Sequence, residues 1–402
     1  MRTVANIFLI LFLNAAIIGI AEMLLADRTV FAWLPLMSDF VGDLLMLFAL
    51  LLYIGFAVNR HLPKSVLVPP MIFLGWGLIA FWPLENCVDH YLAYVLIAQL
   101  LLGILVLQRN LQLNKKSRLL VRSQFAGPSM STGTMFRFML LNIPLFPLLL
   151  LLLLFSSVSE IVENQGAGFM CLKPNGLYMV EKIYQRGEKQ IHLSGMIHLG
   201  QQSYFDSLSK VLSSKQALML AEGVSDRQGL LKNDFSYQKI ADLLGLASQE
   251  RMLIDGRLID VESLENLEDK LAEKTDVLPA DIDLAEFDER TITLLNALGH
   301  YLLGNDSLLE GFREFNQWAR QNTTPETNQV VMNDLVQKRN RQVLSYLPKA
   351  LKKYDTIIIP WGALHMPGLE TAVIGKGFHL QEQHKRLSID FLLLPYERLW
   401  AD

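Results

Sequence analysis

The stretch LLNIPLFPLLLLLLLFSSVSE, residues 140–160, divides the sequence into two parts of opposite character. It is almost wholly apolar up to Phe155 and ends in serine and glutamate. Upstream, to Val158, the 402-residue chain is mostly leucine, isoleucine, phenylalanine, valine and alanine, whereas downstream it has the composition of a soluble protein. This contrast predicts an all-α transmembrane bundle over residues 1–158 and a separate soluble domain after it.

Four further apolar stretches precede this one, and each is long enough to cross a bilayer. About 20 apolar residues in a helix cover the roughly 30 Å of a hydrocarbon core. We therefore expect five transmembrane helices, at about 4–25, 41–58, 65–84, 91–108 and 138–157. The first follows Arg2 as a signal peptide would, but no small-x-small cleavage site follows it, so we expect an uncleaved helix.

Basic residues in the predicted loops indicate the orientation of the bundle. The N-terminus carries Arg2, the second loop carries Arg60 and Lys64, and the fourth loop is rich in lysine and arginine. The third loop carries only Glu85 and Asp89. This alternation predicts a cytoplasmic N-terminus, and five crossings then place the C-terminal domain outside. The short loops favour a bacterial inner membrane and a periplasmic domain.

The membrane part is predicted to be an anchor embedded in the lipid bilayer. Transporters usually pair ionisable groups near mid-membrane, and no such pair is evident in the predicted spans. Two cysteines, Cys87 and Cys171, are both expected on the outer side. They can form a disulfide in an oxidising compartment or remain free thiols, and their number excludes an all-cysteine zinc site.

The soluble part is acidic, with 26 basic and 34 acidic residues after Val158. Phosphate binding needs a basic surface, so nucleic acid is not an expected partner. A short polar linker is expected at 159–170, followed by a folded domain at 171–402.

Alternating and helical patterns indicate the elements of this domain. Strands are expected at 176–184, 189–194, 216–221, 354–360, 377–381 and 389–394. Helices are expected at 203–213, 237–246, 261–271, 291–303, 328–352 and 367–376. Alternation of strands and helices around a mainly helical middle predicts an α/β or α+β domain with a helical insertion.

One small motif, G-x-x-H, occurs near both ends of the domain. Gly195 to His198 follows an early strand, and Gly362 to His365 follows a late one. A third strand ends at Glu222. Ligands in α/β sheets bind beyond the carboxyl ends of strands, and glycine allows a tight turn there. Two imidazoles and one carboxylate meeting in such a place can bind a divalent metal or perform acid–base chemistry.

Together, SGMIHLG (194–200), LMLAEGV (218–224), KRNRQ (338–342) and IIIPWGALHMPGLE (357–370) resemble the TraB/GumN family. This family includes the pheromone-shutdown proteins and the Tiki membrane ectoenzymes, which are metal-dependent proteases. The resemblance covers nearly all of residues 170–380 and none of the membrane part. Pro360 and Trp361 replace the small aliphatic residues expected before the second motif.

The resemblance implies roles for four residues. His198 and His365 would be metal ligands, and Glu222 would be a third ligand or the base that activates a metal-bound water. Arg339 would hold a substrate carboxylate or an oxyanion, or would instead form a salt bridge with an acidic neighbour. The few ligands and the open site favour manganese or cobalt over a structural zinc.

An acidic segment near the middle of the domain is the next candidate. It contains Asp281, Asp283, Glu286 and Asp288, but it lacks the glycine and the ligand spacing of an EF-hand loop. A solvated or helix-capping face is the favoured interpretation, and a place at the border of the metal site is the alternative. His192 is left out of the site because it lies out of phase with the apolar face of its strand.

These observations favour a membrane-anchored, metal-dependent hydrolase that acts on peptides or proteins outside the cytoplasmic membrane. A protein of the same fold that binds or sequesters a peptide signal without cleaving it is the alternative. A complete set of ligands favours catalysis, although function belongs to the site rather than to the fold.

Overall fold

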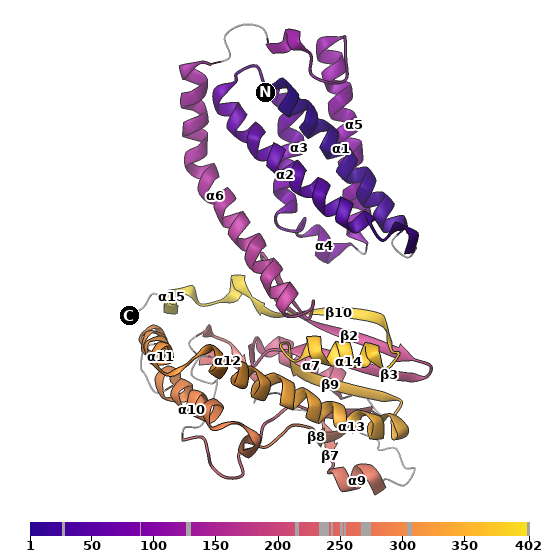
Figure 1. The fold of residues 1–402 in the computed structure, drawn as a ribbon, viewed down its shortest axis with the longest axis vertical. Coiled ribbons are helices and arrows are strands. Elements are labelled where there is room, and N and C mark those ends of the chain that lie inside the picture. Colours follow the sequence, from indigo (N-terminus) through magenta and orange to yellow (C-terminus); the bar gives the residue numbers. More distant parts are fainter. Residues whose placement is uncertain are drawn as a thin grey trace. The chain divides into compact units, whose positions relative to one another are not determined.

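The computed structural model describes residues 1–399 apart from 26–28, 89, 126–129, 214–216, 233–240, 243, 250–251, 253–254, 267–274 and 304–307. The chain divides into two compact units, Met1–Val158 and Ser159–Asp402 (Figure 1). The first unit is helical and the second contains an α/β domain, as the sequence predicts.

Four helices of the first unit are long and apolar enough to cross a membrane, counted over the described residues. They are α1 (Arg2–Leu25), α2 (Leu34–Val58), α5 (Tyr91–Asn114) and α6 (Thr132–Gln165). The expected span at 65–84 is instead the 14-residue helix α3 (Lys64–Gly77), followed by turns in which Ala80 and Phe81 have φ of 50° and 58°. The predicted count of five spanning helices is therefore not confirmed.

Helices α2 and α5 both pack antiparallel to α1. A Cβ on Gly55, near the end of α2, would lie 2.6 Å from Met1 at the start of α1. A Cβ on Gly103 of α5 would lie 2.5 Å from Leu13, and Leu96, earlier in α5, lies against Gly19, later in α1. The end of α2 and the start of α5 thus lie at opposite ends of α1. The chain returns between them through α3 and the short helix α4 (Leu84–Cys87). Two 3-10 turns, η1 (Thr29–Phe31) and η2 (Arg122–Phe125), complete the unit.

A mixed sheet forms the centre of the second unit. Its order is β1-β2-β3-β9-β5-β8-β7. Strand β10 lies outside this order and pairs with the edge of β2 that does not face β3. Strands β3, β9, β5, β8 and β7 are parallel, whereas β1, β2 and β10 pair antiparallel. The strand bounds are β1 Met170–Lys173, β2 Gly176–Arg186, β3 Lys189–Met196, β5 Ala217–Ala221, β7 Gly256–Leu258, β8 Thr275–Pro279, β9 Thr356–Gly362 and β10 His379–Asp390. A separate two-stranded sheet joins β4 (Leu199–Gly200) to β6 (Ala247–Ser248).

Each face of the sheet buries an apolar cluster under helices. On one face, Ile191, Leu193, Ile357 and Ile359 pack with α13 (Arg339–Lys353), α14 (Met366–Gly375) and α9 (Val261–Asn266). On the other, Met196, Met219 and Ile358 pack with α7 (Gln202–Leu212). The period-2 alternation of the strands therefore supplies two cores.

The helical insertion follows β8. It contains η4 (Leu284–Glu286), α10 (Glu289–Leu298), the π-helical η5 (Gly299–Leu303), α11 (Leu308–Asn322) and α12 (Pro325–Met332). A second π-helical segment, η6 (Asn333–Lys338), joins α12 directly to α13. The chain ends with η7 (Phe391–Leu393) and α15 (Tyr396–Leu399).

The sequence predicts most of these elements, and the differences are informative. The hairpin of β2 and β3, the strands β5 and β9 and the helices α7, α10 and α14 are confirmed within a few residues, and the long helix expected at 328–352 is formed by α12, η6 and α13 in succession. Strands β1 and β8 and helix α11 were not expected, and the two short C-terminal strands are one long strand, β10. Residues 159–165, expected in a linker, are the last turns of α6. Half of the helix expected at 237–246 lies outside the described residues. Cys87 and Cys171 are free thiols.

Candidate functional site

Four polar residues follow the carboxyl ends of four neighbouring parallel strands. His198 comes after β3, His365 after β9, Glu222 after β5 and Asp281 after β8. The strands lie in the order β3-β9-β5-β8, so all four residues lie at the same edge of the sheet. This edge is where α/β folds place ligands, as the sequence analysis assumed.

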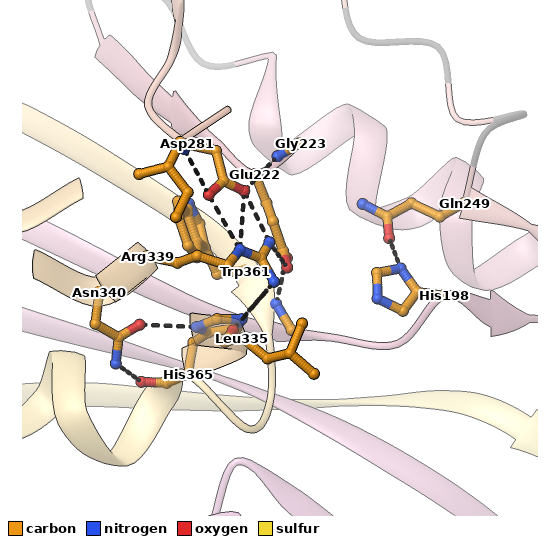
Figure 2. A network of polar contacts seen from close by, with 12 residues as sticks. His198, Glu222, Gly223, Gln249, Asp281, Leu335, Arg339, Asn340, Trp361 and His365 are labelled. Carbon is orange, nitrogen blue, oxygen red and sulfur yellow. Dashed lines mark hydrogen bonds and ion pairs between the residues drawn. The ribbon is translucent and has the colours of Figure 1, made fainter. Parts of the chain in front are cut away.

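Arg339 joins three of the strand ends in one buried group (Figure 2). Its Nη2 donates to Glu222 Oε1 and to Asp281 Oδ2, both at 2.7 Å, and its Nε donates to Asp281 Oδ1 at 3.0 Å. Its Nη1 donates to Nε2 of His365 at 3.1 Å. The side chains of Arg339, Glu222 and Asp281 are 12%, 6% and 1% exposed. Burial disfavours the charged guanidinium, but hydrogen bonds and attraction from Asp281 and Glu222 outweigh it and raise the pKa of Arg339.

The position of Arg339 follows from the helix that carries it. Arg339 and Asn340 are the first residues of α13, directly after the π-helical segment η6. A π-helical turn shifts the helix face relative to a regular α-helix, and such segments are frequent at functional sites. Directly after the π-helical segment, the polar residues Arg339 and Asn340 lie on the buried side of α13. Further along, this side of the helix buries the apolar residues Val343, Leu347 and Ala350.

His365 is a neutral imidazole held from both ring nitrogens. Its Nδ1 lies 2.8 Å from Asn340 Oδ1, and Asn340 Nδ2 donates to the His365 carbonyl at 3.1 Å. Burial first, and then the nearby Arg339 cation, lowers the pKa of His365 to about 4. An amide oxygen only accepts, so Nδ1 carries the hydrogen and the Nε2 lone pair faces Arg339. The Trp361 ring meets the imidazole edge-on, with centroids 5.0 Å apart and planes at 83°.

The glycines of the motifs allow close approach rather than unusual backbone angles. Gly195 and Gly362 are strand residues and do not have positive φ. A Cβ on Gly195 would lie 3.1 Å from both Cβ and O of Phe169, and a Cβ on Gly368 would lie 2.6 Å from Asn340 Nδ2. The tight turn expected from the sequence is therefore not the reason for Gly195 and Gly362. The Gly362 N–H also donates to Glu222 Oε2 at 2.6 Å.

His198 is held apart from this group by a different partner. Its Nδ1 lies 2.8 Å from Gln249 Oε1, and the Gln249 N–H donates to the His198 carbonyl at 2.9 Å. Figure 2 shows its other ring nitrogen on the side that faces Arg339 and Glu222. The structure thus brings Glu222, Arg339 and His365 into one hydrogen-bonded group and leaves His198 beside it. Their functional roles stay predictions.

Asp281 lies beside Arg339 and Glu222, as the alternative interpretation of the acidic segment expects, and not on the solvated or helix-capping face that was favoured. The favoured interpretation of its segment holds for two neighbours, since Asp283 caps η4 and Asp288 caps α10. Asp281 itself is buried against Arg339 and accepts from the Gly223 N–H at 3.0 Å. Its location directly after a strand was the available signal, but strand β8 was not recognised.

A second buried charged group lies on the α7 face of the sheet. Glu181 Oε2 accepts from Arg386 at 2.6 Å, and Glu181 Oε1 lies 3.2 Å from Nδ1 of His192. Burial alone would raise the pKa of Glu181, but the hydrogen bonds from His192 and Arg386 lower it to about 2. His192 is therefore hydrogen-bonded within this buried group.

The donor atoms at the strand ends suit a divalent cation in their chemistry. Both motif histidines engage an amide oxygen through Nδ1, which orients the Nε2 lone pair as metal sites require. Glu222 Oε1 lies 3.5 Å from His365 Nε2. Two carboxylates face one guanidinium, so the group has a formal charge of −1. In this structure Arg339 engages both Glu222 and His365, and no group of three His, Cys, Asp or Glu residues in the described part of the chain has metal-site geometry.

Comparison of the chain with protein-family models, with curated proteins and with solved structures gives no match. The resemblance to the TraB/GumN family accordingly depends on the motifs quoted above.

Proposed function

We propose that the chain is a membrane-anchored hydrolase whose reaction centre is the strand-end group of His365, Glu222, Asp281 and Arg339, with His198 beside it. The observation that carries the proposal is the buried Arg339, which binds two carboxylates and a neutral imidazole at one sheet edge. A neutral histidine with an oriented lone pair, a carboxylate and a cation are the parts that acyl hydrolysis uses.

Each residue has a chemical role in this proposal. His365 stays neutral at pH 7 because its pKa is lowered to about 4, so its Nε2 lone pair remains a ligand or an acceptor. Glu222 is either the base that accepts the proton of the attacking water or the third metal ligand. Arg339 stabilises the negative charge that develops on the carbonyl oxygen, and Asp281 keeps the guanidinium in place.

His198, His365 and Glu222 would hold a divalent metal, and manganese or cobalt suits these few ligands better than zinc. A bound metal would lower the pKa of water into the neutral range, which would supply hydroxide at neutral pH. The proposed substrates are peptides or proteins, since the motifs resemble those of the TraB/GumN family.

The proposed location is the outer side of the cytoplasmic membrane, in a bacterium the periplasmic side. We infer that residues 59–90 make a further crossing although α3 alone has only 14 residues, because the end of α2 lies against the start of α1 and the start of α5 lies against the later part of α1. With α1, α2, α5 and α6 this gives five crossings. The basic loops then place the N-terminus in the cytoplasm and the C-terminal domain outside.

The test is hydrolysis of a mixed peptide library by the full chain, purified in detergent and supplied with manganese, cobalt or zinc. Glu222→Gln keeps the shape of the side chain and removes the base, and His379→Ala changes an exposed histidine on β10 as a matched control. Chelator-sensitive cleavage that is lost in Glu222→Gln and kept in His379→Ala supports the proposal. A folded wild-type chain that binds peptides without cleaving them under any of these metals contradicts it and favours the signal-binding alternative.

A further inference from the structure

Three large apolar side chains near the C-terminus are exposed on an ordered turn. Leu392 is 81% exposed, Leu393 70% and Tyr396 49%, and we call them the C-terminal apolar patch. Asp390 Oδ1 accepts from the Leu392 N–H at 2.9 Å, and the Tyr396 hydroxyl donates to the Phe391 carbonyl at 2.7 Å. The backbone is therefore fixed in a form that presents both leucines to the surroundings.

The patch lies close to the point where α6 enters the domain. Ser159, in the last turns of α6, donates through Oγ to the Leu172 carbonyl of β1 at 2.9 Å. Leu172 pairs with Leu177 of β2, and Leu177 pairs with Ile389 of β10. Two strand spacings of about 4.8 Å each separate β1 from β10. The Phe391 N–H also donates to the carbonyl of Asn175, in the β1–β2 turn, at 2.9 Å.

The depth of this region along α6 matches the surface of a bilayer. The apolar run of α6 ends at Phe155, four residues before Ser159, which is about 6 Å along a helix. No residue of α6 is buried, so its apolar surface is available to lipid. The β1–β2 turn and the patch are therefore connected, through hydrogen bonds and strand pairing, to the part of α6 that directly follows its apolar run.

The composition of the patch also favours lipid as its partner. Leucine partitions into hydrocarbon, and tyrosine is enriched at membrane–water interfaces. The charged residues of the segment, Asp390, Glu397 and Arg398, have no excess of positive charge that would recognise anionic headgroups.

We propose that the C-terminal apolar patch inserts into the bilayer leaflet next to the exit of α6 and gives the domain a second membrane contact. Two contacts restrict rotation of the domain about α6. The patch lies at the same end of the sheet as the strand-end residues. Ser388, near the end of β10, accepts through its carbonyl from the Gln201 N–H at 2.8 Å, and Gln201 lies three residues after His198. The sheet edge with His198 is thereby held near the bilayer surface.

The experiment uses the full chain in phosphatidylcholine nanodiscs, with Cys87→Ser and Cys171→Ala removing the native thiols. Single cysteines at Leu393, Leu380 and Leu150 are labelled in turn with an environment-sensitive fluorophore, and nitroxide-labelled lipid is added as quencher. Leu380 is 49% exposed at the other end of β10, about 33 Å at strand spacing from Asp390, where the turn with Leu393 begins, and is the matched control. Leu150, 46% exposed within α6, reports a lipid-embedded position.

Lipid insertion predicts blue-shifted emission and strong quenching at Leu393 and Leu150, and neither at Leu380. Because the contact is with hydrocarbon, the quenching at Leu393 stays the same when anionic lipid is added or salt is raised. Emission at Leu393 that matches Leu380 while Leu150 is quenched overturns the proposal, and so does an unquenched Leu150. Neither result depends on any enzymatic activity of the domain.

Discussion

Replacing Arg339 with methionine tests whether the buried group at the strand ends is formed as described. The substitution keeps most of the side-chain volume and removes the cation that pairs with Glu222 and Asp281 at 2.7 Å each. Both carboxylates are nearly inaccessible to water, so the change leaves them buried without their partner. Removing one member of a buried ion pair typically costs about 3–5 kcal/mol. We expect a loss of that order in the free energy of unfolding at pH 7.

The assay is denaturant unfolding of the 159–402 unit followed by circular dichroism, with Arg341→Met as control. Arg341 lies two residues further along α13 and is exposed, so its replacement should change stability by less than about 0.5 kcal/mol. Asp281→Asn completes a double-mutant cycle. Because Arg339 and Asp281 share hydrogen bonds, the double variant should lose clearly less stability than the sum of the single changes. Effects that add to within about 0.5 kcal/mol would refute the contact.

Three further predictions concern the residues around this group. The pKa of His365 is about 4 in the folded chain and 6.5 in the unfolded chain, so the unfolded chain binds the proton first as the pH falls. The free energy of unfolding should therefore drop by on the order of 3 kcal/mol between pH 6.5 and pH 4. His365→Asn should flatten this part of the plot of stability against pH, and an unchanged plot would contradict the prediction. Gly368→Ala should destabilise by about 1–3 kcal/mol because its Cβ meets Asn340, whereas Gly375→Ala, with open space around it on the same helix, should be nearly neutral; thermal melts of both variants decide this. The pKa of Glu181, lowered to about 2, contributes stability above pH 4.5 that is lost as the pH falls towards 2, and acid titration of Glu181→Gln should lack this loss.

The strand-end residues could be predicted because each follows a recognisable pattern. The run YDTIIIP is apolar enough to predict β9, so His365 is expected just after the carboxyl end of that strand. The run LMLAE predicts β5 in the same way, and Glu222 is expected at its carboxyl end. Strand β8 has only five residues, TDVLP, of which Val277 and Leu278 are aliphatic, so the position of Asp281 could not be recognised. Tertiary contacts, rather than local pattern, define such short strands.

Other features depend on contacts that a single sequence does not display. The π-helical turn before Arg339 has no periodicity of its own, yet it directly precedes the residue that joins the strand ends. Strand β10 is almost entirely polar and exposed up to Lys385, so it lacks the alternation that predicts a strand. Gln249, the partner of His198, lies in a segment without a motif. In the membrane part, mean apolarity alone cannot reveal that the chain leaves the helix after Gly77.

Binding of manganese to the full chain tests the central claim most directly. Equilibrium dialysis followed by metal analysis is applied to the wild type, to a His198→Ala, His365→Ala double variant and to the His379→Ala control. The account predicts a single tightly bound ion in the wild type and in the control, and none in the double variant. A folded wild type that binds no manganese, cobalt or zinc, or a double variant that binds as much as the wild type, would contradict it.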